Sequence, residues 1–416
     1  MRCSPPLALL AVLLGAGCPS ADTPDPSYVT WTEDVRPLVT EYCVGCHVDG
    51  GAGPFSLSNY EDAARWASAS AQAVAARTMP PFLADGSGDC HTWKNNRWLS
   101  EAQIRVFEDW VASETPEGPE LAPPTPPELP VLAGDIETVD IGADYVPSSG
   151  ATDDYRCFVV DSPGTFAATG FEVVPGNPEI VHHLIAYQVT SEASADEARQ
   201  LDEDSDGPGY ACLGTGPQID DYYDLAGWAP GLGAEIFPEG TGIEIDGDLP
   251  LIIEMHYNVV AEDPAPDRTA LRFSTVPLGT VRPIVGVAGW DFDFVAPPGL
   301  ASWSTTELVP VSWSLPDGYQ GEVTLLGVNA HMHQRGVSTT YSVLRGDGPE
   351  CLLDIPRWDF DWQLTYWYSE PVTVQSNAML SITCSFDTTG LDGPLTWGER
   401  TEDEMCLAGF YAVLED

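Results

Sequence analysis

Cysteine and histidine occur together at residues 43–47, where the order is Cys-Val-Gly-Cys-His. Cys43 and Cys46 have the spacing that forms thioether bonds to the two vinyl groups of a haem, and His47 follows at the position that binds the iron. A redox-active dithiol or a plain disulfide beside a histidine is the alternative interpretation. The motif therefore predicts one covalently attached c-type haem.

A second iron ligand is expected downstream of this motif, in a loop. Met79 is the only methionine between residues 28 and 118, and two prolines follow it. Methionine opposite histidine raises the haem potential, which suits electron transfer more than oxygen binding. His91 is the rival ligand, with a surface position as its other interpretation. The surrounding pattern resembles a class I cytochrome c domain, which implies a one-electron carrier.

Five of the seven histidines lie beyond residue 135, and they are His182, His183, His256, His331 and His333. Residues two apart in a strand share a face, so the last two can bind one ion. Adjacent histidines face opposite ways and need a β-bulge, or unequal use of their ring nitrogens, to converge. Imidazole suits copper, and a thioether favours the Cu(I) state. Met405, beside Cys406, is the best candidate for that thioether.

Four short segments occur in an order that resembles a known enzyme family: residues 181–184, 255–257, 330–333 and 403–406. They resemble the copper type II ascorbate-dependent monooxygenases, the family of dopamine β-monooxygenase and peptidylglycine α-hydroxylating monooxygenase. The resemblance covers roughly residues 135–416 and implies two β-sandwich domains, each with one copper, across an open cleft. It implies an electron-storing site made of His182, His183 and His256. It also implies an O2- and substrate-binding site made of His331, His333 and Met405.

The same resemblance bears on substrate and on cysteine pairing. Peptide-amidating relatives bind a terminal carboxylate with an arginine before the His-x-His motif and polar residues after the methionine. Asn329, Leu407 and Gly409 occupy those positions here. The family pattern also implies two disulfides, Cys157–Cys212 and Cys384–Cys406. Cys90 and Cys351 have no family counterpart, so they either join the helical part to the second sandwich or remain free thiols.

The first 17 residues are predicted to be an export signal. Arg2 precedes an apolar run from Pro6 to Gly15 that is too short to cross a bilayer as a helix. The following residues to Cys18 resemble a bacterial lipobox, with the leucine one position early. Cys18 is therefore predicted to carry a lipid that anchors a periplasmic protein, with ordinary signal-peptidase cleavage as the alternative. Export places the cysteines in an oxidising compartment.

Composition limits the partners. The 416 residues are 43% hydrophobic, which is enough for packed cores and excludes a disordered chain. The formal net charge of −48 would repel nucleic acid and anionic membrane surfaces. The expected partners are a small-molecule substrate, O2 and an electron donor, either an ascorbate-like reductant or a periplasmic redox protein. Contact with a membrane is expected only through the N-terminal lipid.

The predicted secondary structure changes along the chain. After a tether at 18–27, residues 28–118 have a helical pattern and are predicted to be the small all-α cytochrome c-like domain. One helix is expected from a cap at residues 32–34 towards Tyr42. Another is expected from Ser100 to Val111, with Ile104, Phe107 and Val111 on its apolar stripe. Residues 119–134 form a proline-rich linker.

Beyond the linker, short alternating segments are separated by Gly, Pro and Asp, which is typical of antiparallel sheets. The segments are 242–245, 251–257, 322–328 and 372–386. Two all-β, jelly-roll-like sandwich domains are predicted, an N-terminal one at 135–283 and a C-terminal one at 284–416.

Together these features predict an exported copper monooxygenase, an oxidoreductase that hydroxylates a C–H bond of a small organic substrate with O2. Its cofactors would be two copper ions and one covalently attached haem, which would supply electrons to the coppers. The alternative is an exported haem–copper protein that carries electrons or binds copper without oxygenase activity.

Overall fold

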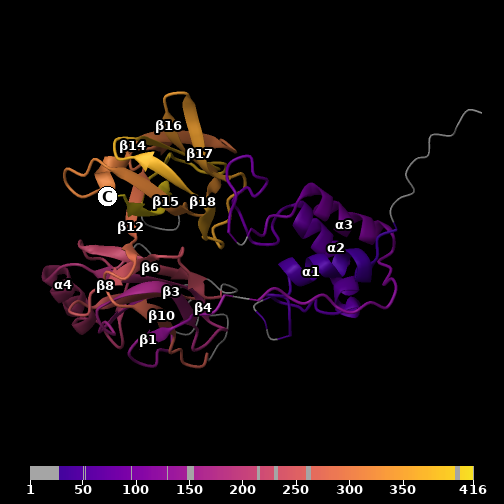
Figure 1. The fold of residues 1–416 in the computed structure, drawn as a ribbon, viewed down its shortest axis with the longest axis horizontal. Helices are drawn as coiled ribbons and strands as arrows, with labels where there is room; N and C mark the ends of the chain where they lie inside the picture. The colour runs from indigo at the N-terminus through magenta and orange to yellow at the C-terminus, as the bar shows by residue number, and fades with distance from the viewer. Residues whose placement is uncertain are drawn as a thin grey trace, which may run out of the picture.

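The computed structural model describes residues 28–49, 51, 53–94, 96–128, 130–147, 154–212, 216–228, 233–258, 264–398 and 403–415. The predicted export signal, the tether and Cys18 lie outside the described residues. A few helices come first, and several sheets follow, most of them antiparallel (Figure 1). In the part of the chain that is described, no helix is long and apolar enough to cross a membrane.

The helical segment holds three α-helices, α1 (Arg36–Tyr42), α2 (Tyr60–Ala75) and α3 (Glu101–Ala112), after a π-helical turn at Trp31–Val35. The predicted cap at residues 32–34 is wrong, because Thr30 accepts the hydrogen bond from the Glu33 N–H and starts the turn. Helix α3 begins with the expected reciprocal capping box between Ser100 and Gln103. The predicted place of Val111 on the buried face is wrong, because Trp110 continues the three-residue spacing of Ile104 and Phe107. Trp110 is buried, and Val111 is only partly buried.

Two sheets follow the linker, and we call them the N-terminal sheet pair. One has the order β1-β10-β3-β8-β11 with β7 beside β3, and the other has the order β5-β2-β9-β4-β6. The strands of the first sheet are β1 (Asp135–Asp140), β3 (Phe166–Val174), β7 (Glu235–Ile236), β8 (Thr241–Ile245), β10 (Ala270–Val276) and β11 (Arg282–Pro283). Those of the second are β2 (Asp154–Val160), β4 (Val181–Val189), β5 (Tyr210–Ala211), β6 (Tyr222–Trp228) and β9 (Leu251–Tyr257). One apolar cluster takes residues from both sheets.

The expectation of purely β structure here is wrong at one place. Helix α4 (Glu192–Glu203) lies between β4 and β5 and packs Ala195 and Ala198 against the outer face of the second sheet. Ser191 caps it by accepting from the Ser194 N–H. Helix formation is local and follows from this cap and the alanines after it.

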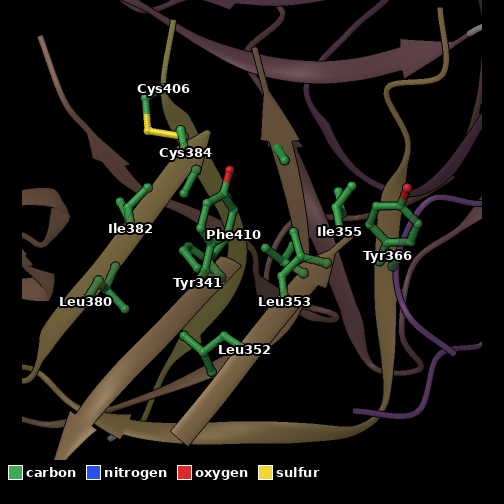
Figure 2. Packing of buried hydrophobic residues seen from close by; sticks show 14 of the residues in the cluster. Tyr341, Leu352, Leu353, Ile355, Tyr366, Leu380, Ile382, Cys384, Cys406 and Phe410 are labelled. Atoms are coloured by element: carbon green, nitrogen blue, oxygen red, sulfur yellow. A yellow bond between two sulfur atoms is a disulfide. The ribbon is translucent and has the colours of Figure 1, made fainter. Parts of the chain in front are cut away.

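The C-terminal sheet pair has the orders β12-β21-β15-β18 and β14-β19-β16-β17. The first contains β12 (Val285–Trp290), β15 (Glu322–His331), β18 (Thr365–Gln375) and β21 (Leu407–Leu414). The second contains β14 (Trp303–Pro310), β16 (Gly336–Arg345), β17 (Gly348–Ile355) and β19 (Met379–Phe386). A short pair, β13 (Val295–Ala296) and β20 (Leu395–Thr396), and a 3-10 turn at Val311–Ser314 complete it. Figure 2 shows the packing of Tyr341, Ile382 and Phe410 between the two sheets.

The two sheet pairs contact each other. Leu326, Trp367 and Val413 of the C-terminal pair belong to the apolar cluster of the N-terminal pair. The Trp367 Nε1–H donates a hydrogen bond to the Glu235 carboxylate. Burial raises the pKa of Glu235 to about 7, against the opposing effect of that hydrogen bond. An acid of the N-terminal pair therefore lies in an apolar contact made by the C-terminal pair.

Replacing Glu235 with glutamine is expected to stabilise the protein at pH 8 but not at pH 5. The raised pKa means that the folded state prefers the neutral acid, so its stabilisation is present below the ordinary pKa of 4.5 and is lost as the pH rises through about 7. Glutamine stays neutral and can still accept from Trp367. Thermal unfolding at both pH values measures this, with exposed Glu239→Gln as the control. An equal Tm for variant and wild type at pH 8 would contradict the assignment.

Candidate metal centres

Three histidines converge at one end of the second N-terminal sheet, and we call them the histidine triad (His182, His183 and His256). Strands β4 and β9 are antiparallel neighbours, and His183 lies directly opposite His256. The register shifts between Val181 and His183, which is the bulge that two adjacent histidines need to converge. The Nδ1 atom of His183 lies 3.3 Å from Nδ1 of His182 and 3.3 Å from Nδ1 of His256.

The triad is suited to a metal ion because its ligand atoms are close together and burial keeps His183 uncharged. One nitrogen from each ring lies within 4.8 Å of the others. Burial lowers the pKa of His183 well below its usual range, and the neighbouring His256, His182 and His331 lower it further. Three imidazoles at this spacing fit copper, which imidazole nitrogen suits as a ligand. Cys157, Cys212 and Glu254 also lie close together, but the two sulfurs are bonded to each other and offer no metal site.

Tyr155 supports the triad from β2, which pairs with β9 and places Tyr155 opposite His256. The two rings stack with centroids 4.1 Å apart and an interplanar angle of 3°. This contact fixes the plane of one ligand ring. Nothing in the local sequence around Tyr155 shows which ring it will cover, so the sequence alone gives this residue no role.

Replacing Tyr155 with leucine is expected to weaken copper binding at the triad by about 10- to 100-fold, the usual cost of losing a residue that orients a ligand. Copper at the other centre should be unaffected. Titration with a competing chelator measures both affinities, and Tyr155→Phe, which keeps the ring, is the matched control. Unchanged affinity in the leucine variant would show that the stacking does not orient His256.

A second group lies on the C-terminal sheet pair, where β15 ends, and we call it the C-terminal centre (His331, His333 and Met405). The rings of His331 and His333 lie 5.1 Å apart at 85°. Gln363 Oε1 accepts from His331 Nδ1 at 2.5 Å, and the Asp403 carbonyl accepts from His333 Nδ1 at 3.1 Å. With both Nδ1 atoms engaged, each ring keeps Nε2 for a metal.

Burial also keeps His331 of the C-terminal centre uncharged. It lowers the pKa of His331 to about 4, with a smaller lowering from His333 and an opposing effect of Gln363. Trp358 donates from Nε1 to the His333 carbonyl at 3.0 Å, and the Phe360 ring lies 6.1 Å from the His333 ring. Trp358 and Phe360 therefore lie against His333.

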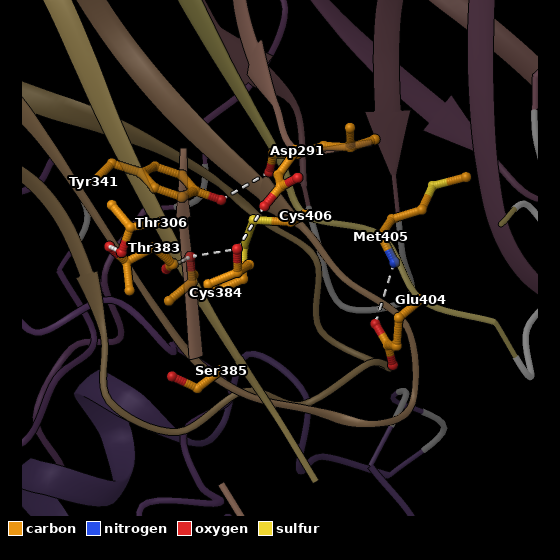
Figure 3. Close-up of a disulfide and its surroundings, with 12 residues drawn as sticks. Asp291, Thr306, Tyr341, Thr383, Cys384, Ser385, Glu404, Met405 and Cys406 are labelled. Carbon is orange, nitrogen blue, oxygen red and sulfur yellow. Dashed lines mark hydrogen bonds between the residues drawn. A yellow bond between two sulfur atoms is a disulfide. The ribbon is translucent and has the colours of Figure 1, made fainter. Parts of the chain in front are cut away.

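Met405 is placed by its two chain neighbours (Figure 3). Cys406 forms a disulfide with Cys384 on β19. Glu404, fully buried, accepts at Oε2 from the His333 N–H at 2.8 Å and the Met405 N–H at 3.3 Å. Burial raises the pKa of Glu404 to about 7, and these hydrogen bonds oppose the rise. One carboxylate thus joins the histidine segment to the methionine segment, a role that the sequence analysis did not assign to Glu404.

The haem motif follows α1. Cys43 and Cys46 are the two described cysteines that form no disulfide. Burial, and then the charge of Cys46, raise the pKa of the Cys43 thiol to about 12, whereas reactive dithiols have lowered pKa values. The buried His47 directs Nδ1 to the Phe55 carbonyl at 3.0 Å, which leaves Nε2 for a metal. A Cβ on Gly53 would lie 2.7 Å from His47 Nδ1, so glycine makes room for this ring. The residues present fit a c-type haem.

The other candidate ligands of the helical segment lie apart from the motif in sequence. Met79 follows α2 and lines a small cavity with Arg77 and Trp98. His91, predicted to be a surface residue if not a ligand, is half-buried instead. Its ring lies 5.0 Å from that of Tyr368 on β18, and burial lowers its pKa.

One family of known proteins is similar to the C-terminal part of the chain. Residues 306–412 match the model of the copper type II ascorbate-dependent monooxygenase, C-terminal domain, and this span includes the whole C-terminal centre. Among curated proteins, none matches the chain.

Three solved structures show a weak structural similarity to this chain. PNGF-II, solved in a C2 space group, is 9% identical over 68% of this chain and 65% of its own length, with a TM-score of 0.28. The major capsid protein P2 of bacteriophage PM2 is 8% identical over 68% of this chain and 98% of its own, with a TM-score of 0.26. A structure of Broad Bean Stain Virus is 10% identical over 61% and 78%, with a TM-score of 0.24. No functional argument rests on these three.

Proposed function

We propose that this protein is a copper monooxygenase that hydroxylates a C–H bond of a small organic substrate with O2. The observation that carries the proposal is the difference between its two centres. The triad brings three imidazoles together at their Nδ1 atoms, whereas the C-terminal centre would combine two imidazoles, through Nε2, with the Met405 thioether. A storage or carrier protein does not need two unlike sites. The family match over residues 306–412 supports the same conclusion.

Each residue group has a distinct role in this proposal. Copper would supply one-electron chemistry and O2 activation at the C-terminal centre. Met405 provides a soft ligand that favours Cu(I), and Glu404 keeps it next to His333. Gln363 and the Asp403 carbonyl hold the two imidazoles in the tautomer that presents Nε2. The triad, with nitrogen ligands alone, would hold the copper ion that stores the second electron.

In this proposal the helical segment is a cytochrome c-like domain. Cys43 and Cys46 would attach a haem, and His47 and Met79 would bind its iron as a pair suited to electron transfer. Its electrons would come from an ascorbate-like reductant or a periplasmic redox protein. The N-terminal signal and a lipid on Cys18 would place the protein at a bacterial membrane surface. Three disulfides fit an oxidising compartment.

Oxygen consumption coupled to product formation tests the proposal. Copper-loaded protein, a reductant and isotopically labelled O2 are incubated with a metabolite extract, and products that gain one labelled oxygen are sought by mass spectrometry. A His331→Ala, His333→Ala double variant is the control for oxygen reduction by free copper. Oxygen uptake with no labelled product would favour the carrier or copper-binding alternative.

Glycine-extended peptides are expected to be poor substrates. Asn329 lies two residues before His331 on the same face of β15, where amidating relatives would place an arginine. A Cβ on its cross-strand partner Gly409 would lie 2.2 Å from Asn329 Oδ1, so the amide covers this glycine. Neither residue, nor Leu407, offers a cationic or phenolic contact to a carboxylate. Product analysis with such peptides measures this, and efficient amidation with tight peptide affinity would contradict it.

A further inference from the structure

Residues 79–99, which we call the strap, lie between α2 and α3 but pack into the C-terminal sheet pair. Phe82, Leu83, Ala84 and Trp93 are all at most 7% exposed and belong to the apolar cluster between its two sheets. In Figure 1 the strap runs beside β17 and β18. The helical segment is therefore attached to the C-terminal sheet pair by buried side chains, whereas the proline-rich linker leads to β1 of the N-terminal sheet pair.

Backbone contacts and a disulfide fix the strap at the two sheet edges. Strands β17 and β18 are the edge strands of their sheets. On β18, the Lys94 N–H donates to the Trp367 carbonyl at 2.8 Å, and Trp93 forms a β-bridge with Tyr368. On β17, the Asp85 N–H donates to the Asp354 carbonyl at 2.8 Å, and Cys90 is bonded to Cys351. The strap thus pairs with backbone groups that edge strands otherwise leave unpaired.

The strap also makes a route from Met79 to the C-terminal centre that combines side-chain contacts with two three-residue steps along the chain. Phe82, three residues after Met79, places its ring 5.1 Å from the Tyr366 ring, edge on. The Leu83 N–H donates to the Tyr366 hydroxyl at 3.3 Å. Three residues before Tyr366, Gln363 accepts from His331 Nδ1 at 2.5 Å.

The contacts of the strap are one-sided. Within the described residues, its hydrogen bonds to the sheets, its ring contacts with them and its disulfide all lead to residues 350–369. These residues belong to the C-terminal sheet pair, which carries His331 and His333. The triad lies on the other sheet pair.

We propose that the strap is the electron-transfer junction of this protein and that it delivers electrons first to the C-terminal centre, through Phe82, Tyr366 and Gln363. The inference rests on the proposed function, since it needs haem at Cys43–His47 and copper at both centres. The step moves one electron: ferrous haem becomes ferric, and Cu(II) at the C-terminal centre becomes Cu(I), with no bond made or broken. The external reductant then restores ferrous haem.

Single-turnover haem oxidation tests the route. Full-length protein with ferrous haem and oxidised copper is prepared by rapid reduction without O2, and the haem band is followed by absorbance. A His182→Ala, His183→Ala variant should keep the fast phase of haem oxidation. A His331→Ala, His333→Ala variant should lose it. The opposite pattern, with electrons entering at the triad, would overturn the inference while leaving haem-to-copper donation intact.

Wild-type haem that is oxidised equally fast with and without copper would overturn donation itself, and the route with it. One substitution in the strap, with a control outside it, tests the route directly. Phe82→Leu should slow haem oxidation because it removes the ring contact with Tyr366, whereas Phe292→Leu, at an exposed ring away from the strap, should not. The haem spectrum and copper content show whether each variant keeps its cofactors. A Phe82→Leu variant with both cofactors and an unchanged rate would overturn the route.

Discussion

Replacing Met405 with alanine is expected to reduce hydroxylation by about 100-fold or more while the fold and the copper of the triad persist. The C-terminal centre would keep His331 and His333, whose positions depend on Gln363, Glu404 and the Asp403 carbonyl and not on the thioether. It would lose the soft ligand that favours Cu(I). Product formation at saturating reductant measures the effect, and X-ray absorption of the reduced protein reports the loss of a sulfur ligand.

Met379→Ala is the matched control for this substitution. Met379 is a half-buried methionine at the start of β19, so its loss removes a thioether of the same kind from the same sheet pair. Its turnover should match that of the wild type. Wild-type turnover in the Met405→Ala variant, loaded with copper, would refute Met405 as a ligand.

Replacing His183 with alanine is expected to lower the copper content from two ions to one and to abolish hydroxylation. His183 is the central residue of the triad, because its Nδ1 lies 3.3 Å from both of the other Nδ1 atoms. Without it, only two imidazoles remain to hold the ion, and the second electron of each turnover would have no storage site. Metal analysis after dialysis and the copper EPR spectrum measure the loss.

The control for His183→Ala is His91→Ala, which removes a half-buried histidine that packs on the aromatic residues Trp93 and Tyr368. That variant should retain two copper ions. If His183→Ala also retained two tightly bound ions, the triad would not be a copper site.

Parts of the fold follow from local sequence because the physics that forms them is local. The alternation at residues 251–257 predicts a strand, and β9 spans those residues. Ser100 and Gln103 predict a capping box, and α3 begins there. Helix α4 carries a similar signal in Ser191 and the alanines after it, and it was missed because the surrounding pattern was strand-like.

The strap has no comparable signal. Its buried residues, such as Phe82 and Trp93, follow neither helical nor strand spacing, since they fill gaps in a core made mainly by other parts of the chain. Cys90 pairs with Cys351 across a separation of 261 residues, and the cysteine count alone leaves many pairings open. Such contacts depend on which sheet edges remain uncovered after folding. No short stretch of the sequence shows which edges these are.

The ligand types follow from the sequence alone: an adjacent histidine pair, a His-x-His pair, a methionine beside a cysteine and a Cys-x-x-Cys-His motif. Which ring nitrogen each histidine offers follows from the folded structure. The choice of nitrogen depends on which group accepts a hydrogen bond from the other ring nitrogen or packs against it. Gln363 and Asp403, which accept these hydrogen bonds, lie 32 and 70 residues from His331 and His333 in the sequence. Residue type sets which metal can bind, whereas orientation is set by partners that only folding brings together.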